Sequence, residues 1–139
     1  MSPALDLSSP CPCGTGRLAE SCCAPVHSGA VQAPTAEALM RSRYTAFVVG
    51  DVDHLLASWH PQTRPETLDL DPDTVFTRLR VLETVDGGES DETGTVAFRA
   101  HSRHDGERST QTEVSRFVRA DDGSRRWLYL DGVDGAPQG

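Results

Sequence analysis

The second quarter of the chain carries a helical hydrophobic pattern. Apolar or aromatic residues recur there every three or four positions, as they do on the buried face of a helix. Thr35 is a suitable N-cap, and Gly50 suits the left-handed end of a first helix. A second helix can begin at Asp51 and end before Pro61, because the residue before proline avoids helical backbone. Residues 65–68 predict one further turn, with a proline at its first position.

The second half of the chain has a different pattern, in which apolar and polar residues alternate. The alternation begins at Val75 and is interrupted by turn sequences at residues 86–88, 104–106 and 121–123. Four strands joined by hairpin-length loops predict an antiparallel sheet. Two helices followed by such a meander indicate an α+β fold, with the helices packed on one face of a curved sheet.

Length and charge narrow the class of protein. A chain of 139 residues fits one domain with a small appendage. Its 21 acidic and 13 basic residues give a formal charge of −8. Because DNA and RNA phosphates repel an acidic chain unless its cations are segregated, we expect no nucleic-acid partner. All 13 basic residues are arginine, which excludes Schiff-base chemistry and a phosphate-binding P-loop.

The sequence has no feature that predicts a membrane partner. No apolar run approaches the ~20 residues that a membrane helix needs. The first ten residues have neither the basic start nor the apolar centre of a signal peptide. We therefore expect a cytoplasmic protein.

The four cysteines form the strongest chemical signal in the chain. A reducing compartment keeps such thiols free, and four thiolates suit the tetrahedral shell of zinc. Gly14 and Gly16 allow the tight loop that such a site requires. A shell filled by sulfur leaves no position for a reacting water, so we expect structural rather than catalytic zinc. The expected ligands are Cys11, Cys13, Cys22 and Cys23.

Two details of this cluster stay open. Neighbouring side chains on a helix point about 100° apart, so Cys22 and Cys23 reach one ion only where the helix unwinds. We expect Ala24-Pro25 to end the turn there. His27 can replace one sulfur or lie in a solvated loop, and the loop is favoured. A redox dithiol and unligated core cysteines are the alternatives to zinc.

The cysteine segment resembles a known zinc motif. Cys11-Pro-Cys-Gly-Thr-Gly followed by Cys22-Cys23 is similar to the SEC-C motif, named for the carboxyl end of the SecA translocation ATPase. The motif is attached to many unrelated proteins, and the resemblance implies zinc binding and a small protein-contact module.

Four further segments resemble the YchJ-like family, a group of uncharacterised bacterial proteins. They are residues 40–47, 59–61, 115–117 and 127–132. The resemblance implies a cone-shaped domain like nuclear transport factor 2, in which helices pack against a curved sheet, and it implies no reaction. The expected organisation is a SEC-C zinc knuckle at residues 1–27, a linker at 28–34, the cone at 35–133 and a tail at 134–139.

Several residues depart from simple alternation and are candidate ligand contacts. Arg116 lies between Val114 and Val118 on an expected core face, so it needs an acidic partner such as Asp131 or a wet cavity. Trp127, Tyr129 and Asp131 alternate onto one face of the last strand. The residues expected in the cavity of the cone are Arg41, Arg43, Tyr44, Trp59, His60, Glu113, Arg116, Trp127, Tyr129 and Asp131.

Three functions are compatible with these residues. The first is a binding module for a small acidic ligand or a protein, because arginine donates paired hydrogen bonds to carboxylate or phosphate. A salt-bridge network between helix and sheet is the competing interpretation. The second is a hydratase, isomerase or hydrolase in which His60 pairs with Asp131 or Glu113, an argument from fold analogy. The third is an adaptor in secretion or protein quality control. A monomer and a homodimer both stay open.

Overall fold

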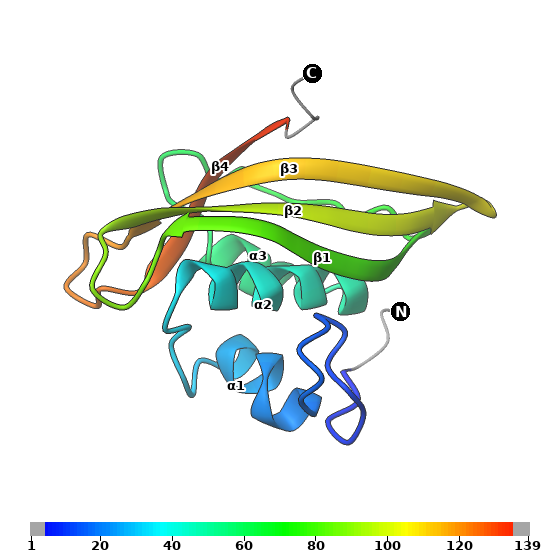
Figure 1. Ribbon diagram of the computed structural model, residues 1–139, viewed down its shortest axis with the longest axis horizontal. Helices are drawn as coiled ribbons and strands as arrows, with labels where there is room; N and C mark the ends of the chain where they lie inside the picture. Colours follow the sequence, from blue (N-terminus) through cyan, green and yellow to red (C-terminus); the bar gives the residue numbers. More distant parts are fainter. Residues whose placement is uncertain (1–4, 135–139) are drawn as a thin grey trace.

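The computed structural model describes residues 5–134 and has three layers (Figure 1). A four-stranded sheet forms one layer, and helices α2 (Ala36–Val49) and α3 (Val52–Ala57) lie against it. Helix α1 (Cys23–Ser28), a short 3-10 turn (Ala19–Ser21) and the N-terminal loop pack on the other side of α2. None of the helices within the described residues has the length and apolar character to cross a bilayer. The expected tail beyond Asp134 lies outside the described residues.

Caps confirm both predicted ends of α2 and the predicted start of α3, but α3 ends at Ala57 and not before Pro61 as expected, because Trp59 pairs with β4. The Thr35 side chain accepts a hydrogen bond from the Ala38 amide at 3.0 Å, and Gly50 ends α2 with a φ of 77°. Asp51 caps α3 by accepting from the His54 amide at 3.0 Å. The further turn predicted at residues 65–68 is wrong, since that segment has no helix. Four residues form too few hydrogen bonds to offset helix nucleation without packing.

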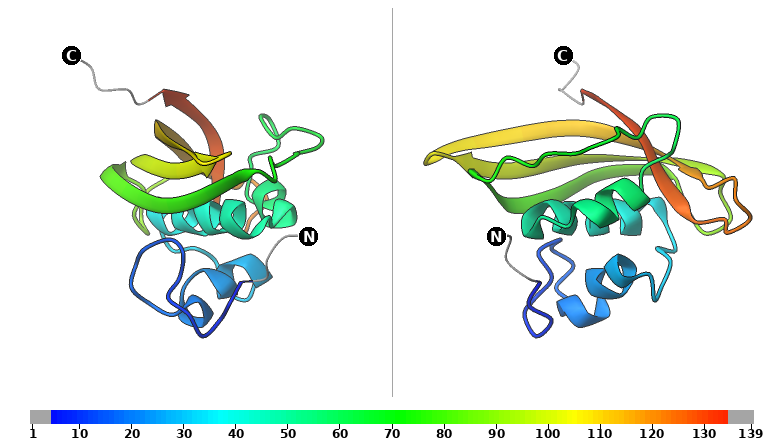
Figure 2. Two further views of the ribbon diagram at one scale, coloured as in Figure 1. Left: turned by 90° about the vertical axis from the view of Figure 1, so that its right-hand side faces the viewer. Right: turned by 180° about the vertical axis from the view of Figure 1, so that it is seen from behind.

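The sheet is the predicted antiparallel meander, with its strands in chain order. Figure 2 shows its curvature over the helices. Irregularities in β1 and between β3 and β4 interrupt the ladders, as bulges do where a sheet bends. The α+β fold class is therefore confirmed. The strands are β1 (Thr74–Asp86), β2 (Thr93–His104), β3 (Glu107–Arg119) and β4 (Trp127–Asp134).

The chain after α3 joins the edge of the sheet at β4. The Tyr129 amide donates to the Ser58 carbonyl at 2.8 Å, and the His60 amide donates to the Tyr129 carbonyl at 2.7 Å. These two bonds place Trp59 beside Tyr129 in a parallel bridge. The end of α3 and the final strand therefore form one wall of the cone.

Strand β3 presents the opposite face to the helices from the one predicted. Ser115 and Phe117 are 3% and 1% exposed and face the helices, whereas the Arg116 side chain is 53% exposed on the outer face. Val114 and Val118 lie beside Arg116 on that outer face and are half-buried. The prediction that Arg116 lies on a core face is wrong, because the two valines that suggested it cover the outside of the sheet.

Helix α2 has buried side chains around most of its circumference. Met40 and Tyr44 face the sheet, whereas Thr45 lies against the cysteine cluster. One apolar cluster consequently runs from Cys11 through α2 to Phe117. The N-terminal layer and the cone share a core. The buried residues of α2 are Ala36, Leu39, Met40, Ser42, Arg43, Tyr44, Thr45 and Ala46.

Gly94 lies so close to the backbone of Gly87, at the end of β1, that we expect its substitution to destabilise the fold. A Cβ atom at Gly94 would lie 2.4 Å from the Gly87 Cα, whereas one at Gly88 would meet only the Asp91 carboxylate at 3.3 Å. We expect Gly94→Ala to lower the free energy of unfolding by about 2 kcal/mol or more, because two backbone segments must separate. Gly88→Ala, the matched control, should change it by less than about 1 kcal/mol, since the Asp91 side chain can rotate. Urea unfolding measures both, and equal effects would contradict the packing argument.

Candidate metal centre and pocket

The four cysteine sulfurs converge on one point. All four lie within 4.8 Å of one another, and the sulfurs of Cys13 and Cys22 are 3.5 Å apart. A tetrahedral ion with zinc–sulfur bonds of about 2.3 Å separates its sulfurs by roughly 3.8 Å. All four cysteines are free thiols, and only Cys22 is more than slightly exposed. The donor set and its geometry fit a tetrahedral thiophilic cation.

Local backbone geometry brings these sulfurs together. The Cys11 amide donates to the Arg17 carbonyl at 2.8 Å and closes a tight loop, in which Gly14 has a φ of 87°. Cys22 separates the 3-10 turn from α1 with a backbone (φ −127°, ψ −98°) that is not helical. This break, rather than the expected one at Pro25, lets Cys22 and Cys23 point to the same place.

The expectation that Ala24-Pro25 ends the helical turn is wrong. Pro25 is the third residue of α1, which continues to Ser28. Proline is tolerated in a first turn because its missing N–H has no intrahelical partner there. Helix α1 therefore begins at the last cysteine instead of ending beside it.

Helix α2 contributes polar contacts to the cluster. The fully buried Thr45 hydroxyl lies 3.4 Å from the Cys23 sulfur and 3.7 Å from the Cys11 sulfur. Arg41 donates to the Cys13 carbonyl at 2.6 Å and to Glu37 at 2.9 Å. Arg41, expected in the cone cavity, instead fastens the cysteine loop to α2.

Proton sharing among the thiols also favours a cation. Hydrogen bonds from the Cys13 and Cys23 thiols lower the pKa of Cys11, and the same bonds raise the pKa of both partners. The cluster therefore holds one thiolate readily and resists forming more without a cation. A divalent metal supplies that charge.

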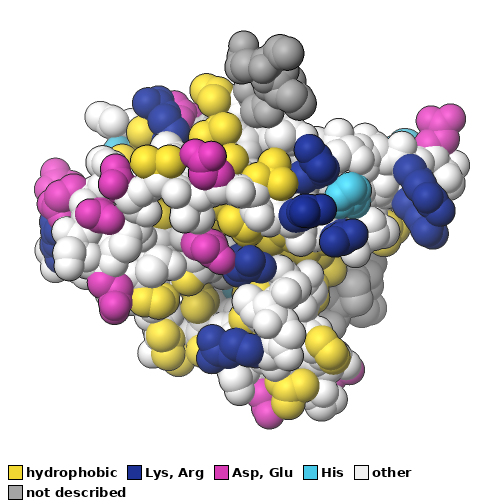
Figure 3. All heavy atoms as spheres, viewed as in Figure 1, with side chains coloured by type: hydrophobic (Ala, Val, Ile, Leu, Met, Phe, Trp, Pro, Cys, Tyr) yellow, Lys and Arg dark blue, Asp and Glu magenta, His cyan; other side chains and the backbone are white. Residues whose placement is uncertain are grey.

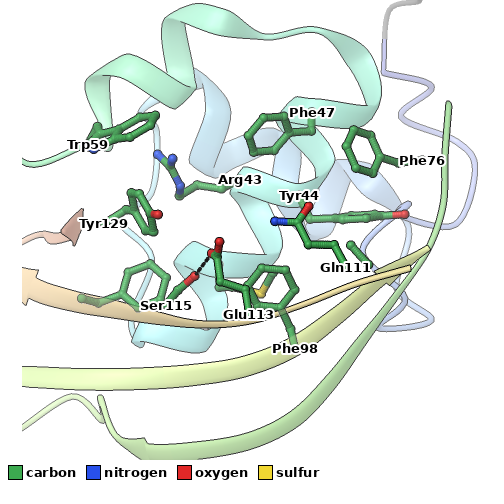
Figure 4. A pocket seen from close by; sticks show the side chains of 13 residues that line it. Arg43, Tyr44, Phe47, Trp59, Phe76, Phe98, Gln111, Glu113, Ser115 and Tyr129 are labelled. Atoms are coloured by element: carbon green, nitrogen blue, oxygen red, sulfur yellow. Dashed lines mark hydrogen bonds between the residues drawn. The ribbon is translucent and has the colours of Figure 1, made fainter. Parts of the chain in front are cut away.

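A pocket lies between α2 and the concave face of the sheet, with a volume of about 170 Å³. Figure 4 shows aromatic rings around it, with the polar side chains of Arg43, Glu113 and Gln111 among them. Such a lining is typical of small-molecule sites. The lining residues are Met40, Arg43, Tyr44, Phe47, Trp59, Phe76, Phe98, Ala100, Gln111, Glu113, Ser115, Phe117 and Tyr129.

Arg43 is the dominant charge in this pocket. It is 6% exposed and donates to the Leu55 carbonyl at 2.8 Å and to the Ser58 hydroxyl at 2.7 Å. Its guanidinium carbon lies 5.1 Å from the ring centre of Trp59 and 4.4 Å from that of Tyr129, which is cation–π distance (Figure 4). Burial lowers the pKa of Arg43 to about 10, so the side chain stays charged at neutral pH. Within residues 5–134, no carboxylate lies within 4 Å of it.

Other polar groups stand near this cation. Glu113 accepts from the Ser115 hydroxyl at 2.8 Å and packs on Gly132, where a Cβ atom would come within 2.4 Å of the Glu113 carboxyl carbon. Burial raises the pKa of Tyr129 to about 12, so its hydroxyl remains a donor. The indole Nε1 of Trp59 is buried and has no hydrogen-bond partner within the part of the chain that the structure describes. The pocket therefore offers several donors and one carboxylate.

Comparison with known proteins shows the family to which this chain belongs. Residues 35–132 match the family model described as YchJ, middle NTF2-like domain. The chain belongs to the YchJ-like family. It is 52% identical over 123 residues to the UPF0225 protein SCO1677 of Streptomyces coelicolor, covering 88% of this chain and 94% of that protein. A UPF0225 protein of Deinococcus radiodurans is 44% identical over 126 residues, covering 90% and 89%.

Two solved structures of SEC-C motif proteins share the fold of this YchJ-like chain. The solution structure of RPA3114 from Rhodopseudomonas palustris matches with a TM-score of 0.78 and 32% identity, covering 91% of this chain and 98% of that one. A crystal structure from Psychrobacter arcticus matches with a TM-score of 0.75 and 26% identity, covering 96% and 87%. The fold and the family expected from the sequence are confirmed.

Half of the residues expected in the cavity of this YchJ-like domain line it: Arg43, Tyr44, Trp59, Glu113 and Tyr129. Arg116 and Asp131 do not, because they pair on the outer face with Nε 2.6 Å from Oδ1. The ladder pairs Arg116 with Asp131 but Phe117 with Tyr129, so Leu130 is bulged. This bulge turns Asp131 away from the face that Tyr129 occupies, contrary to expectation.

The remaining two expected residues, Trp127 and His60, do not line the pocket either. Trp127 is buried under Arg119 and donates to the Pro34 carbonyl at 3.4 Å, in a second cleft. The His60 Nδ1 accepts from the Gln62 amide at 3.1 Å, and among the described residues His60 contacts no carboxylate. The expected acid–base pair of His60 with Asp131 or Glu113 is therefore not formed.

Sequence reasoning placed Glu113 in the pocket but missed its two polar neighbours on the same wall, Gln111 and Ser115. Gln111, Glu113 and Ser115 occupy alternate positions on the inner face of β3. These residues alternate in the sequence, but Val114 and Val118 alternate on the other face of β3 and made that face look like the buried one. Phe76 and Phe98 also line the pocket, but the sequence pattern does not distinguish them from ordinary core residues.

His27 occupies neither of its expected places. Its side chain is 9% exposed, its Nε2 donates to the Ser42 carbonyl at 2.7 Å, and its Nδ1 lies 3.5 Å from the Asp51 carboxylate. The ring stacks on His54 with centres 4.5 Å apart. His27 is thus neither near the sulfurs nor solvated, and it joins α1 to α2 and α3.

His54 predicts a pH dependence of stability. Burial, and then the neighbouring His27, lower the pKa of His54 to about 4 from its ordinary 6.5. The unfolded chain therefore takes up this proton first as pH falls, and stability is lost between pH 6.5 and 4. The expected loss between pH 7.5 and 5 is about 2 kcal/mol.

Urea unfolding at several pH values tests this effect. His54→Gln keeps a group that can bond Ser42 and should flatten the profile in this window. His104→Gln, at a half-exposed histidine, should leave the profile unchanged. Parallel profiles for the native protein and both variants would show that His54 is not the group responsible.

Proposed function

We propose that this protein is a small-ligand binding module, with a structural zinc in its N-terminal layer and an organic-acid site in its cone. The zinc part is supported by the four converging sulfurs. With every tetrahedral position filled by thiolate, the ion has no place for a reacting water. Its role is to hold the cysteine loop against α2.

Zinc content tests the first part. We expect one zinc per chain in protein purified without chelators. Cys13→Ser should lose most of it and melt at a lower temperature, because structural zinc contributes on the order of 10 kcal/mol in small peptides. Ser21→Ala, at an exposed neighbouring position, is the control and should retain zinc. Elemental analysis that finds no zinc in the native protein, or full zinc in Cys13→Ser, would refute this part.

The organic-acid site is supported above all by the buried guanidinium of Arg43. A buried charge is costly unless it is compensated, and Arg43 has carbonyl, hydroxyl and ring partners but no close carboxylate among the described residues. A carboxylate in the pocket would compensate this charge, because arginine forms charge-assisted paired hydrogen bonds with it.

The rest of the pocket limits the ligand further. A cavity of about 150 Å³ can hold benzene, so about 170 Å³ suits a ligand of similar ring size. The aromatic lining favours an apolar body. Glu113 in the same pocket disfavours a doubly charged phosphate, because like charges repel strongly away from bulk water. The chemistry that fits is a small aromatic or branched monocarboxylic acid.

Benzoate is a direct probe of this site, with benzamide as its uncharged counterpart. We expect benzoate to shift the indole resonance of Trp59 in NMR spectra and to bind at least tenfold more tightly than benzamide. The reason is that only the carboxylate forms a charge-assisted pair with Arg43. Equal binding of the two probes, or no saturable shift with benzoate, would contradict the proposed ligand class.

Two alanines on β2 supply matched variants for the same measurement. Ala100 lines the pocket, and Ala97 lies on the outer face of the same strand. Ala100→Leu should fill the cavity and abolish benzoate binding, whereas Ala97→Leu should leave it intact. Identical behaviour of the two folded variants would show that benzoate binds elsewhere.

A further inference from the structure

The outer face of the sheet carries a segregated group of cations. On β2, Phe98 and Ala100 line the pocket, so Arg99 between them points to the opposite face. The same alternation and the strand register assign neighbouring residues of β1, β2 and β3 to this face. We call the group the basic face: Arg78, Arg80, Arg99, His101, Arg103 and Arg108.

Cross-strand neighbours on this face have the same charge. Arg80 is paired with Arg99 in the ladder. Further along β2, Arg103 is paired with Arg108. Like charges directly opposite each other destabilise a sheet, so these pairs do not serve the fold. Figure 3 shows the resulting group of dark-blue side chains around a histidine on the sheet.

The basic face is not neutralised by carboxylates of the described residues. Among residues 5–134, its five arginines have no carboxylate within 4 Å, whereas four arginines elsewhere in the fold do: Arg41, Arg116, Arg125 and Arg126. Four of the five are exposed and Arg99 is half-exposed. Removing these five cations from the formal charge of −8 leaves −13 on the rest of the chain. An acidic chain can bind an anionic partner only where its cations are segregated. The basic face meets this condition.

The dimensions and borders of the basic face limit its partner. Arg99 and Arg103 are separated by about 13 Å along β2, and three strands span about 10 Å. Acidic groups border it at the hairpin end, where Asp71 and Asp105 contact His104. A long polyanion would extend over these carboxylates and be repelled. No Phe, Tyr or Trp lies on the basic face to stack on nucleic-acid bases.

We propose that the basic face docks a short acidic segment of a partner protein, about four to six residues rich in Asp and Glu. Guanidinium groups pair with carboxylates through two parallel hydrogen bonds, and several such pairs can form within this area. Exposed ion pairs are individually weak, so binding needs several at once and weakens as salt rises. The site lies on the face opposite the pocket and does not depend on the proposed ligand.

A fluorescein-labelled hexaglutamate peptide tests the proposal by fluorescence anisotropy. Saturable binding is expected at 0.05 M salt and, more weakly, at 0.15 M salt. Arg99→Gln/Arg103→Gln should weaken binding at least tenfold. The control, Arg64→Gln/Arg126→Gln, removes the same charge away from the basic face and should weaken it less than twofold. Equal weakening by the two folded variants, or no saturable binding to the native protein, would overturn the proposal.

Two further measurements exclude other occupants. A 12-base-pair DNA duplex that binds more tightly than the peptide, with the same dependence on Arg99 and Arg103, would overturn the choice of an acidic protein segment. Sedimentation of the native chain tests a second copy as the occupant. A dimer that Arg99→Gln/Arg103→Gln dissociates would assign the basic face to self-association instead. A native monomer with arginine-dependent peptide binding supports the proposal.

Discussion

The structure depends on a helix that is buried from two sides. One side of α2 packs on the concave sheet, and the other carries the cysteine layer, so its residues serve two neighbours at once. Thr45 contacts two sulfurs, whereas Tyr44, the preceding residue, lines the pocket. The cysteine loop therefore covers the back of the same helix that forms the pocket floor.

This arrangement explains why a charged side chain lies inside a small protein. Arg43 cannot reach water from the middle of α2, so its environment must compensate its charge. The end of α3 supplies a carbonyl and a hydroxyl, and Trp59 and Tyr129 supply ring faces. The backbone bonds between the α3 end and β4 hold those rings in place. The fold therefore holds a cation within a pocket that is otherwise lined mainly by aromatic and apolar side chains.

The two faces of the sheet have different chemistry because side chains alternate along each strand. The inner face of β2 contributes apolar groups to the pocket, and the outer face contributes arginines. In β4 the bulge at Leu130 interrupts the alternation, so Asp131 lies on the outer face and pairs with Arg116 there. The protein thus combines an enclosed pocket that contains a buried arginine with an open surface of exposed arginines on the other face of the sheet.

The sequence by itself determined what depends on neighbouring residues: the caps at Thr35 and Asp51, the left-handed end at Gly50, the hairpin turns and the clustering of cysteines. Only the tertiary structure decided which face of β3 is buried, where His27 packs and which arginines gather. Alternation defines two faces of a strand but does not say which one meets the helices. That choice depends on packing between residues far apart in the chain, which local pattern does not contain.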